Sequence, residues 1–151
     1  MKTPFQKYPF RSWILVAIQL ACLVYLLSFN PWKAVRIDLQ IWELSGIFIA
    51  ISGLIGLGWF SFSVFPEPRT KARFVRSGIF AFIRHPMYAG VLTTTATLVW
   101  QFFSWDRVVC WLMLVLVFVI KIRIEEKELR LKFPEYAKYE KETNRLIPFV
   151  W

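Results

Sequence analysis

The chain has 151 residues, of which 57% are hydrophobic and 19% aromatic, and it carries a formal net charge of +9. A soluble domain of this length is far less apolar, so the composition excludes an ordinary soluble fold. It favours one membrane domain, residues 1–151, of the all-α polytopic class.

Four stretches are apolar enough to predict membrane-spanning helices. A spanning helix needs about 20 mostly apolar residues. Three stretches without Asp, Glu, Lys or Arg approach or reach that length, at residues 12–29, 44–65 and 87–105. A fourth, Val108 to Ile120, extends to Ile124 if Lys121 and Arg123 lift their charges to the membrane interface. We therefore expect about four spans.

The second predicted span carries small residues at helical spacing. Gly46, Ala50 and Gly53 recur at i, i+4 and i+7. Small side chains let a second helix approach closely, which is a main source of packing energy between membrane helices. The spacing predicts close packing against a neighbouring helix.

The basic residues are unevenly divided among the connections between these spans. Four spans place 16 of the 19 Lys and Arg residues on one side, in the N-terminus, the loop at 66–84 and the tail from Lys121. Positive residues favour the cytoplasmic side. Both termini are therefore expected in the cytoplasm, and the charge indicates membrane topology rather than nucleic-acid binding.

The third and fourth spans are joined only by residues 104–107. So short a connection predicts a tight antiparallel hairpin. Its far ends then meet on the cytoplasmic side, which places Arg84 to Gly90 near Lys121 to Arg130.

The tail beyond the fourth span is charged but keeps an apolar stripe. Leu129, Phe133 and Tyr136 follow at i, i+4 and i+7 and predict an interfacial helical tail facing the membrane. Pro134 should end the preceding helix and can begin a new one as its first residue. Residues 145–151 are apolar enough to fold back against the interface.

His85 is the single histidine, and it precedes a predicted helix start at Pro86. Backbone N–H groups at a helix start can hold an anionic group such as a carboxylate. Tyr88 can share a helix face with His85, while Gly90 leaves space for a ligand or for a neighbouring helix. From the residues alone, an interfacial or structural histidine is an equally good reading.

Glu125 and Glu126 form the second candidate cluster. Adjacent side chains on a helix point about 100° apart, so one carboxylate can face the helix bundle while the other faces water or a cation. A solvated charged face is the alternative. No metal site is predicted, because Cys22 and Cys110 lie in apolar spans without Cys or His neighbours at ligand spacing.

These residues resemble a family of integral-membrane methyltransferases, related to isoprenylcysteine carboxyl methyltransferase and phosphatidylethanolamine N-methyltransferase. The resemblance covers roughly residues 75–148, the half that follows the N-terminal helices of residues 1–74. Its motifs are Gly78, the run Ile83-Arg84-His85-Pro86-Met87-Tyr88-Ala89-Gly90, Glu125-Glu126 with Leu129, Phe133, Tyr136, Tyr139, and Arg145-Leu146-Ile147-Pro148.

The resemblance implies a cofactor, S-adenosylmethionine, and a hydrophobic or lipid-anchored acceptor, either a prenylcysteine-like carboxylate or a phospholipid head group. It implies a bacterial inner membrane or a membrane like that of the endoplasmic reticulum. Arg145 is expected either to position an anionic substrate head or to anchor the tail at the membrane interface. The residues implied in cofactor binding are Arg84, His85, Pro86, Tyr88, Gly90, Glu125 and Glu126.

Two other functions remain open at this point. A relative of the same fold could reduce a sterol or isoprenoid with a nicotinamide cofactor. A non-catalytic membrane subunit could keep the scaffold alone, although paired acids beneath apolar spans are costly without a function.

Overall fold

The computed structural model describes residues 8–28, 36–58, 61–68 and 73–147. The predicted end of the first span at Phe29 and the last four tail residues lie outside these ranges. Within them the chain is helical and has no strand, apart from one isolated parallel bridge between Ile83 and Asn144. The elements are α1 (Phe10–Leu27), α2 (Ile37–Leu57), η2 (Gly78–Ala81), α3 (Pro86–Gln101), α4 (Trp105–Lys132) and α5 (Tyr136–Glu142).

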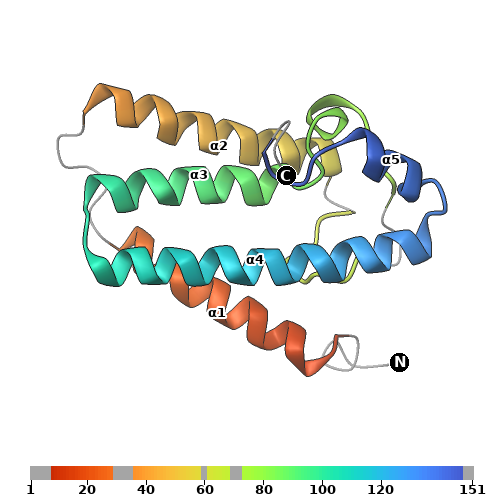
Figure 1. Ribbon diagram of the computed structural model, residues 1–151, viewed down its shortest axis with the longest axis horizontal. Helices are drawn as coiled ribbons and strands as arrows, with labels where there is room; N and C mark the ends of the chain where they lie inside the picture. The colour runs from red at the N-terminus through yellow and green to blue at the C-terminus, as the bar shows by residue number, and fades with distance from the viewer. Residues whose placement is uncertain (1–7, 29–35, 59–60, 69–72, 148–151) are drawn as a thin grey trace.

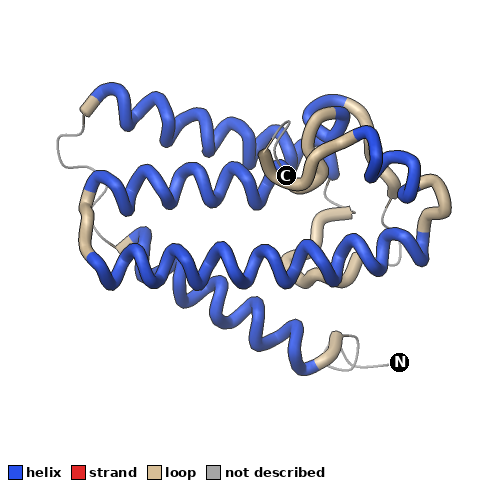
Figure 2. The backbone as a smooth tube through the Cα atoms, in the orientation of Figure 1, coloured by secondary structure: helices blue, strands red, loops and turns tan. Residues whose placement is uncertain are grey.

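The four long helices pack as two pairs, α2 with α3 and α1 with α4 (Figure 1). α3 and α4 run antiparallel across a short loop, yet α3 contacts α2 far more extensively than it contacts α4. The principal partner of α3 is therefore α2 rather than the helix that follows it in the chain. Figure 2 shows most of the described loop segments gathered with α5 at one end of the molecule, while the α3–α4 loop lies at the other end.

The α2–α3 pair is held by the small residues that the sequence predicts. A Cβ added to Gly90 would lie 2.5 Å from the backbone nitrogen of Ala50 and would also meet the carbonyl oxygen of Gly46. A Cβ on Gly53 would lie 2.8 Å from the ring of Pro86. The predicted close packing is confirmed, and the partner helix is α3.

Two described helices are long and apolar enough to cross a bilayer. α1 has 18 residues and a mean hydropathy of 1.9, and α2 has 21 residues and a mean hydropathy of 1.5. Much of their apolar surface faces outward, with Phe48 71% and Ile55 75% exposed. Exposed apolar surface on this scale is stable only if lipid or another protein covers it.

Lys121 lies in a different place from the one that the sequence predicts. The expected snorkelling to the membrane interface is wrong, because the side chain is only 1% exposed. Its ammonium donates to the side-chain oxygen of Gln19 and to the carbonyl oxygen of Val64. Polar groups from α1 and from the 61–68 loop thus hold this cation inside the bundle.

The tail also departs from its predicted placement. α4 ends at Lys132, before Pro134, but α5 begins two residues after the proline rather than at it. Tyr136 does not face the membrane surface, because it is only 2% exposed and packs edge-on against Phe74. The tail therefore closes one end of the helix bundle.

Candidate functional site

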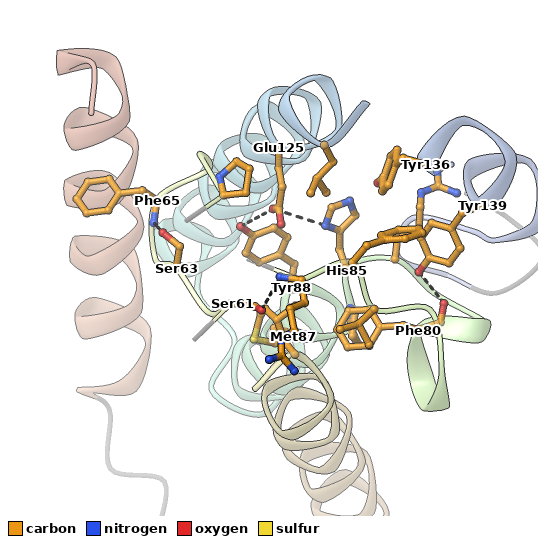
Figure 3. Close-up of a pocket in the computed structure, with 18 residues that line it drawn as sticks. Ser61, Ser63, Phe65, Phe80, His85, Met87, Tyr88, Glu125, Tyr136 and Tyr139 are labelled. Carbon is orange, nitrogen blue, oxygen red and sulfur yellow. Dashed lines mark hydrogen bonds and ion pairs between the residues drawn. The ribbon is translucent and has the colours of Figure 1, made fainter. Parts of the chain in front are cut away.

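A cavity lies where the start of α3, the end of α4 and α5 meet (Figure 3). Its polar lining includes His85 and Tyr88 from the start of α3 and Glu125 from α4. Five aromatic side chains, Phe65, Phe74, Phe80, Tyr136 and Tyr139, also line it, together with the cations Arg73 and Arg84 and several small or aliphatic residues. The cavity therefore combines one carboxylate with polar groups and aromatic rings.

His85 occupies the position just before α3, and Pro86 is the first helical residue, as predicted. The imidazole is 3% exposed and lies between two carboxylates, with Nδ1 3.7 Å from Glu125 Oε2 and Nε2 3.5 Å from Glu126 Oε1. Its ring is stacked on Tyr88, with centroids 5.7 Å apart. Nε2 has no hydrogen-bond partner among the described residues, although a buried polar atom normally has one.

Glu125 is the carboxylate that faces the cavity. The hydroxyl of Tyr88 donates to Glu125 Oε2 at 3.2 Å, and the Glu125 side chain is 28% exposed. Burial raises the pKa of Glu125, although His85 and the Tyr88 hydrogen bond oppose this effect. Glu125 is therefore a partly accessible acceptor with a single described hydrogen bond.

Glu126 points the other way and is neutralised by arginines. Arg84 Nε donates to Glu126 Oε1 at 3.0 Å, and Arg145 contacts both oxygens, with Nε 3.0 Å from Oε2. Burial alone would raise the pKa of Glu126, but the neighbouring His85, Arg84 and Arg145 lower it to about 2. Glu126 does not line the cavity. Instead it joins α4 to Arg84, before the start of α3, and to Arg145, in the tail.

The backbone fixes the tail beside the start of α3. Arg84 N donates to Asn144 O at 2.8 Å, and His85 N donates to Arg145 O at 3.0 Å. In the other direction, Asn144 N donates to Phe82 O at 3.2 Å. These bonds form the isolated parallel bridge, and they hold the arginines close enough to bracket Glu126.

The structure brings together most of the residues that the sequence analysis selects. Arg84, His85, Pro86, Tyr88 and Glu125 line the cavity, while Glu126 and Arg145 lie directly behind it. Gly90 is not among the lining residues and packs against α2. Of the two readings that its sequence context allows, space for a neighbouring helix is the one observed.

Two aromatic side chains of α5 belong to the cavity but were not selected as site residues. Tyr139 donates from its hydroxyl to Phe80 O at 2.6 Å, whereas the buried hydroxyl of Tyr136 has no hydrogen-bond partner among the described residues. Burial raises the pKa of both phenols, that of Tyr139 to about 12, so both are protonated donors at neutral pH. The available signal was their place among the motif residues that carry the family resemblance.

The arrangement suits a small ligand that carries a positive charge beside polar groups. The carboxylate of Glu125 can pair with an ammonium, and aromatic faces attract cations. The Tyr136 hydroxyl, which has no described hydrogen-bond partner, and His85 Nε2, which lies 3.5 Å from Glu126 Oε1, can each bond to a polar group of a ligand. Among the described residues no cluster of His, Cys, Asp and Glu is suited to a metal ion.

A comparison with known protein families identifies the family of this chain. Protein-family models match residues 39–132 to the isoprenylcysteine carboxyl methyltransferase (ICMT) family, while a search of curated proteins found no match. The matched segment runs from α2 to the end of α4 and contains both the His85 motif and the glutamate pair. Because the match covers more than half of the chain, the protein belongs to the ICMT family.

Proposed function

We propose that this protein transfers a methyl group from S-adenosylmethionine to a hydrophobic or lipid-anchored acceptor at the cytoplasmic face of a membrane. The family to which it belongs consists of methyltransferases named for an isoprenylcysteine carboxyl acceptor. The observation that carries the proposal is the cavity in which Glu125, His85 and Tyr136 converge among aromatic rings.

The residues present fit S-adenosylmethionine, which has an ammonium, a carboxylate, a sulfonium and an adenosine. Glu125 would hold the ammonium, because it faces the cavity and is not paired with an arginine. His85 Nε2 and the Tyr136 hydroxyl make no hydrogen bond among the described residues and would bond to the carboxylate or the sugar. The aromatic rings would cover the remaining surface and exclude water.

When bound, the cofactor would supply an electrophilic methyl group on its sulfonium, and in-line transfer of that methyl to a nucleophile would release S-adenosylhomocysteine. Such a displacement depends mainly on alignment and on a dry site. A carboxylate or thiolate acceptor is already nucleophilic, so the chain need not supply a general base. Its residues would orient the two reactants, with Tyr88 fixing the Glu125 carboxylate through their 3.2 Å hydrogen bond.

Arg84, Glu126 and Arg145 would act on the cofactor indirectly. Their ion pairs hold the start of α3 against the end of α4 and the tail. Without them, His85 and Glu125 would lose their fixed separation. The role of Arg145 in positioning an anionic substrate head stays a prediction, because its described contacts go to Glu126.

We further propose four membrane spans, with both termini in the cytoplasm of a bacterial or endoplasmic-reticulum-like membrane. α1 and α2 would supply two of them, α3 the third, and residues 108–124 of α4 the fourth. α3 has 16 residues, about 24 Å at 1.5 Å each, so the bilayer would thin locally around it. The excess of Lys and Arg on one side supports this orientation.

A binding titration distinguishes the proposed methyltransferase from the two alternative functions, a nicotinamide-dependent reductase and a non-catalytic subunit. Purified, detergent-solubilised protein is titrated with S-adenosylmethionine, S-adenosylhomocysteine and NADPH. The wild-type protein should bind both adenosyl compounds. Glu125→Gln and His85→Ala should each lower the affinity for them at least about tenfold, whereas Glu142→Gln, at an exposed position, should leave it unchanged. Binding of NADPH alone would favour the reductase, and binding of none of the three would favour the subunit.

A further inference from the structure

A second cavity lies among all four long helices, beside the first. Its lining includes Gln19 of α1, Ile51 and Leu54 of α2, Val91 of α3 and Lys121 of α4. Ile51 is 49% and Leu54 is 38% exposed, so the α2 rim of the cavity reaches the outer surface of the molecule. In a bilayer this surface would contact lipid chains, which gives an apolar molecule direct access.

The two cavities share a wall. Ser63, Met87 and Tyr88 line both of them. On one side of the wall, Tyr88 stacks on His85 and donates its hydroxyl to Glu125. A molecule in the second cavity therefore lies next to the proposed cofactor site, separated from it by only a few side chains.

Lys121 is the only Asp, Glu, Lys, Arg or His side chain among the described residues lining the second cavity. Its ammonium lies 5.5 Å from the centre of the Tyr88 ring, at the end of the cavity where the shared wall stands. Gln19 and Val64 accept two of its three N–H groups, but both acceptors are neutral. No described carboxylate forms an ion pair with it, although Glu67 and Glu125 act on it from farther away.

A buried charge without an ion partner is costly, and this one lies at the wall of an apolar cavity. An amphiphile with an apolar chain and an anionic head would match both the apolar cavity and the buried cation. Its chain would lie among the α2 and α3 side chains, and its head would pair with Lys121. We propose that this second cavity is the acceptor site and that Lys121 binds the anionic head of the acceptor. This inference rests on the proposed methyl transfer. Tyr88, which lines both cavities, then borders both the acceptor head and the cofactor pocket.

A third cavity on the opposite side of α3 provides an internal comparison. It is lined by Trp42, Ala96 and Val115 among other residues, and its described lining contains no ionisable side chain. It also shares no described lining residue with the cofactor pocket. An amphiphile could enter this cavity, but its head would meet neither a cation nor the proposed cofactor.

The test measures charge selection rather than turnover. The protein is saturated with S-adenosylhomocysteine and titrated with N-acetyl-S-farnesylcysteine, with its neutral methyl ester, and with the amine analogue S-farnesylcysteamine. A hydrogen bond to a charged partner is worth about 1.5–3 kcal/mol, so wild-type protein should prefer the acid over the ester by about 10- to 100-fold. Lys121→Met should reduce this preference to about one, and Lys121→Arg should retain most of it.

The ratio of acid to ester affinity separates binding of the head from a structural role. A Lys121→Met protein that merely packs badly would lose affinity for both compounds equally and keep the ratio, which would overturn the proposal. A wild-type preference for the amine would overturn it as well. Failure of S-adenosylhomocysteine itself to bind would instead reject the proposed function.

The position of the cavity is tested with a matched pair of substitutions. Val91 and Val115 are both half-buried valines, one lining each of the two membrane-facing cavities. Val91→Phe should lower the affinity for the acid at least about tenfold by filling its cavity, whereas Val115→Phe should change it less than about twofold. The reverse pattern would assign the acceptor to the third cavity.

Discussion

Arg84 and Glu126, 42 residues apart in the chain, form an ion pair with Nε 3.0 Å from Oε1 and less than a tenth of either side chain exposed. Arg84 also donates from one terminal nitrogen to the carbonyl oxygens of Glu140 and Thr143. A single guanidinium thus joins the start of α3, the end of α4 and the residues around the end of α5. The relative placement of these three segments, and with it the shape of the cavity, therefore depends on this contact.

Replacing Glu126 should therefore cost stability before it affects chemistry. Glu126→Gln leaves Arg84 buried without its counter-ion and weakens two contacts to Arg145. Breaking a buried ion pair on one side typically costs about 3–5 kcal/mol, and we expect a loss of about 3. Chemical denaturation in detergent measures it, with exposed Glu142→Gln as the control. An effect no larger than that of the control would contradict the joining role of Glu126.

The same carboxylate makes stability depend on acid pH. The pKa of Glu126 is lowered from 4.5 to about 2 in the folded protein. Its contribution to the free energy of unfolding is therefore complete above pH 4.5 and is lost as the pH falls from 4.5 toward 2. The wild-type melting temperature should fall more over this range than that of Glu126→Gln. Parallel curves for the two proteins would show that the ion pairs contribute nothing.

Gly90 should behave as a packing residue. A methyl group there would meet the backbone of α2 at Ala50 N, 2.5 Å away, and at the Gly46 carbonyl, and neither can rotate aside. Gly90→Ala should lower stability by about 2 kcal/mol, within the usual range for an overpacked site. Gly56→Ala is the matched control, because its nearest neighbour is the ring edge of Phe80 at 3.1 Å. Equal melting temperatures for the two variants would contradict the packing role.

Tyr136→Phe should separate binding from stability. The hydroxyl is buried without a described partner, so its removal should leave the melting temperature unchanged or slightly raised. If the hydroxyl bonds to the cofactor, affinity for S-adenosylmethionine should fall about tenfold.

Tyr139→Phe should give the opposite pattern, since the Tyr139 hydroxyl already donates to Phe80 O at 2.6 Å. This substitution should lower the free energy of unfolding by about 1 kcal/mol and should change the affinity for S-adenosylmethionine little. Unchanged cofactor affinity in Tyr136→Phe would remove Tyr136 from the proposed site.

Local sequence signals predicted some parts of this structure well. Pro86 fixes the start of α3 because a proline ring suits the first helical turn, and the small residues of α2 predict close packing because nothing larger would fit. The short connection at residues 104–107 also predicted that Arg84 would lie near the Glu125–Glu126 pair, and Arg84 does contact Glu126.

Other parts could not be predicted, because they depend on partners distant in sequence. The burial of Lys121 requires Gln19, 102 residues away, and the carbonyl of Val64. The different orientations of Glu125 and Glu126 depend on where Arg84 and Arg145 arrive, which the tail sets through backbone bonds to Asn144 and Arg145. Periodicity placed Tyr136 on a membrane face, but the turn at Pro134 directs it into the cavity.

The central claim is methyl transfer that depends on Glu125, and one measurement tests it directly. Purified wild-type protein and Glu125→Gln are incubated with methyl-labelled S-adenosylmethionine and a lipid extract, and the label is followed into the organic phase. The account predicts label that alkali releases as methanol, as a carboxyl methyl ester requires, with at least about a tenfold loss in Glu125→Gln. No transfer by the wild-type protein, or equal transfer by the two proteins, would contradict it.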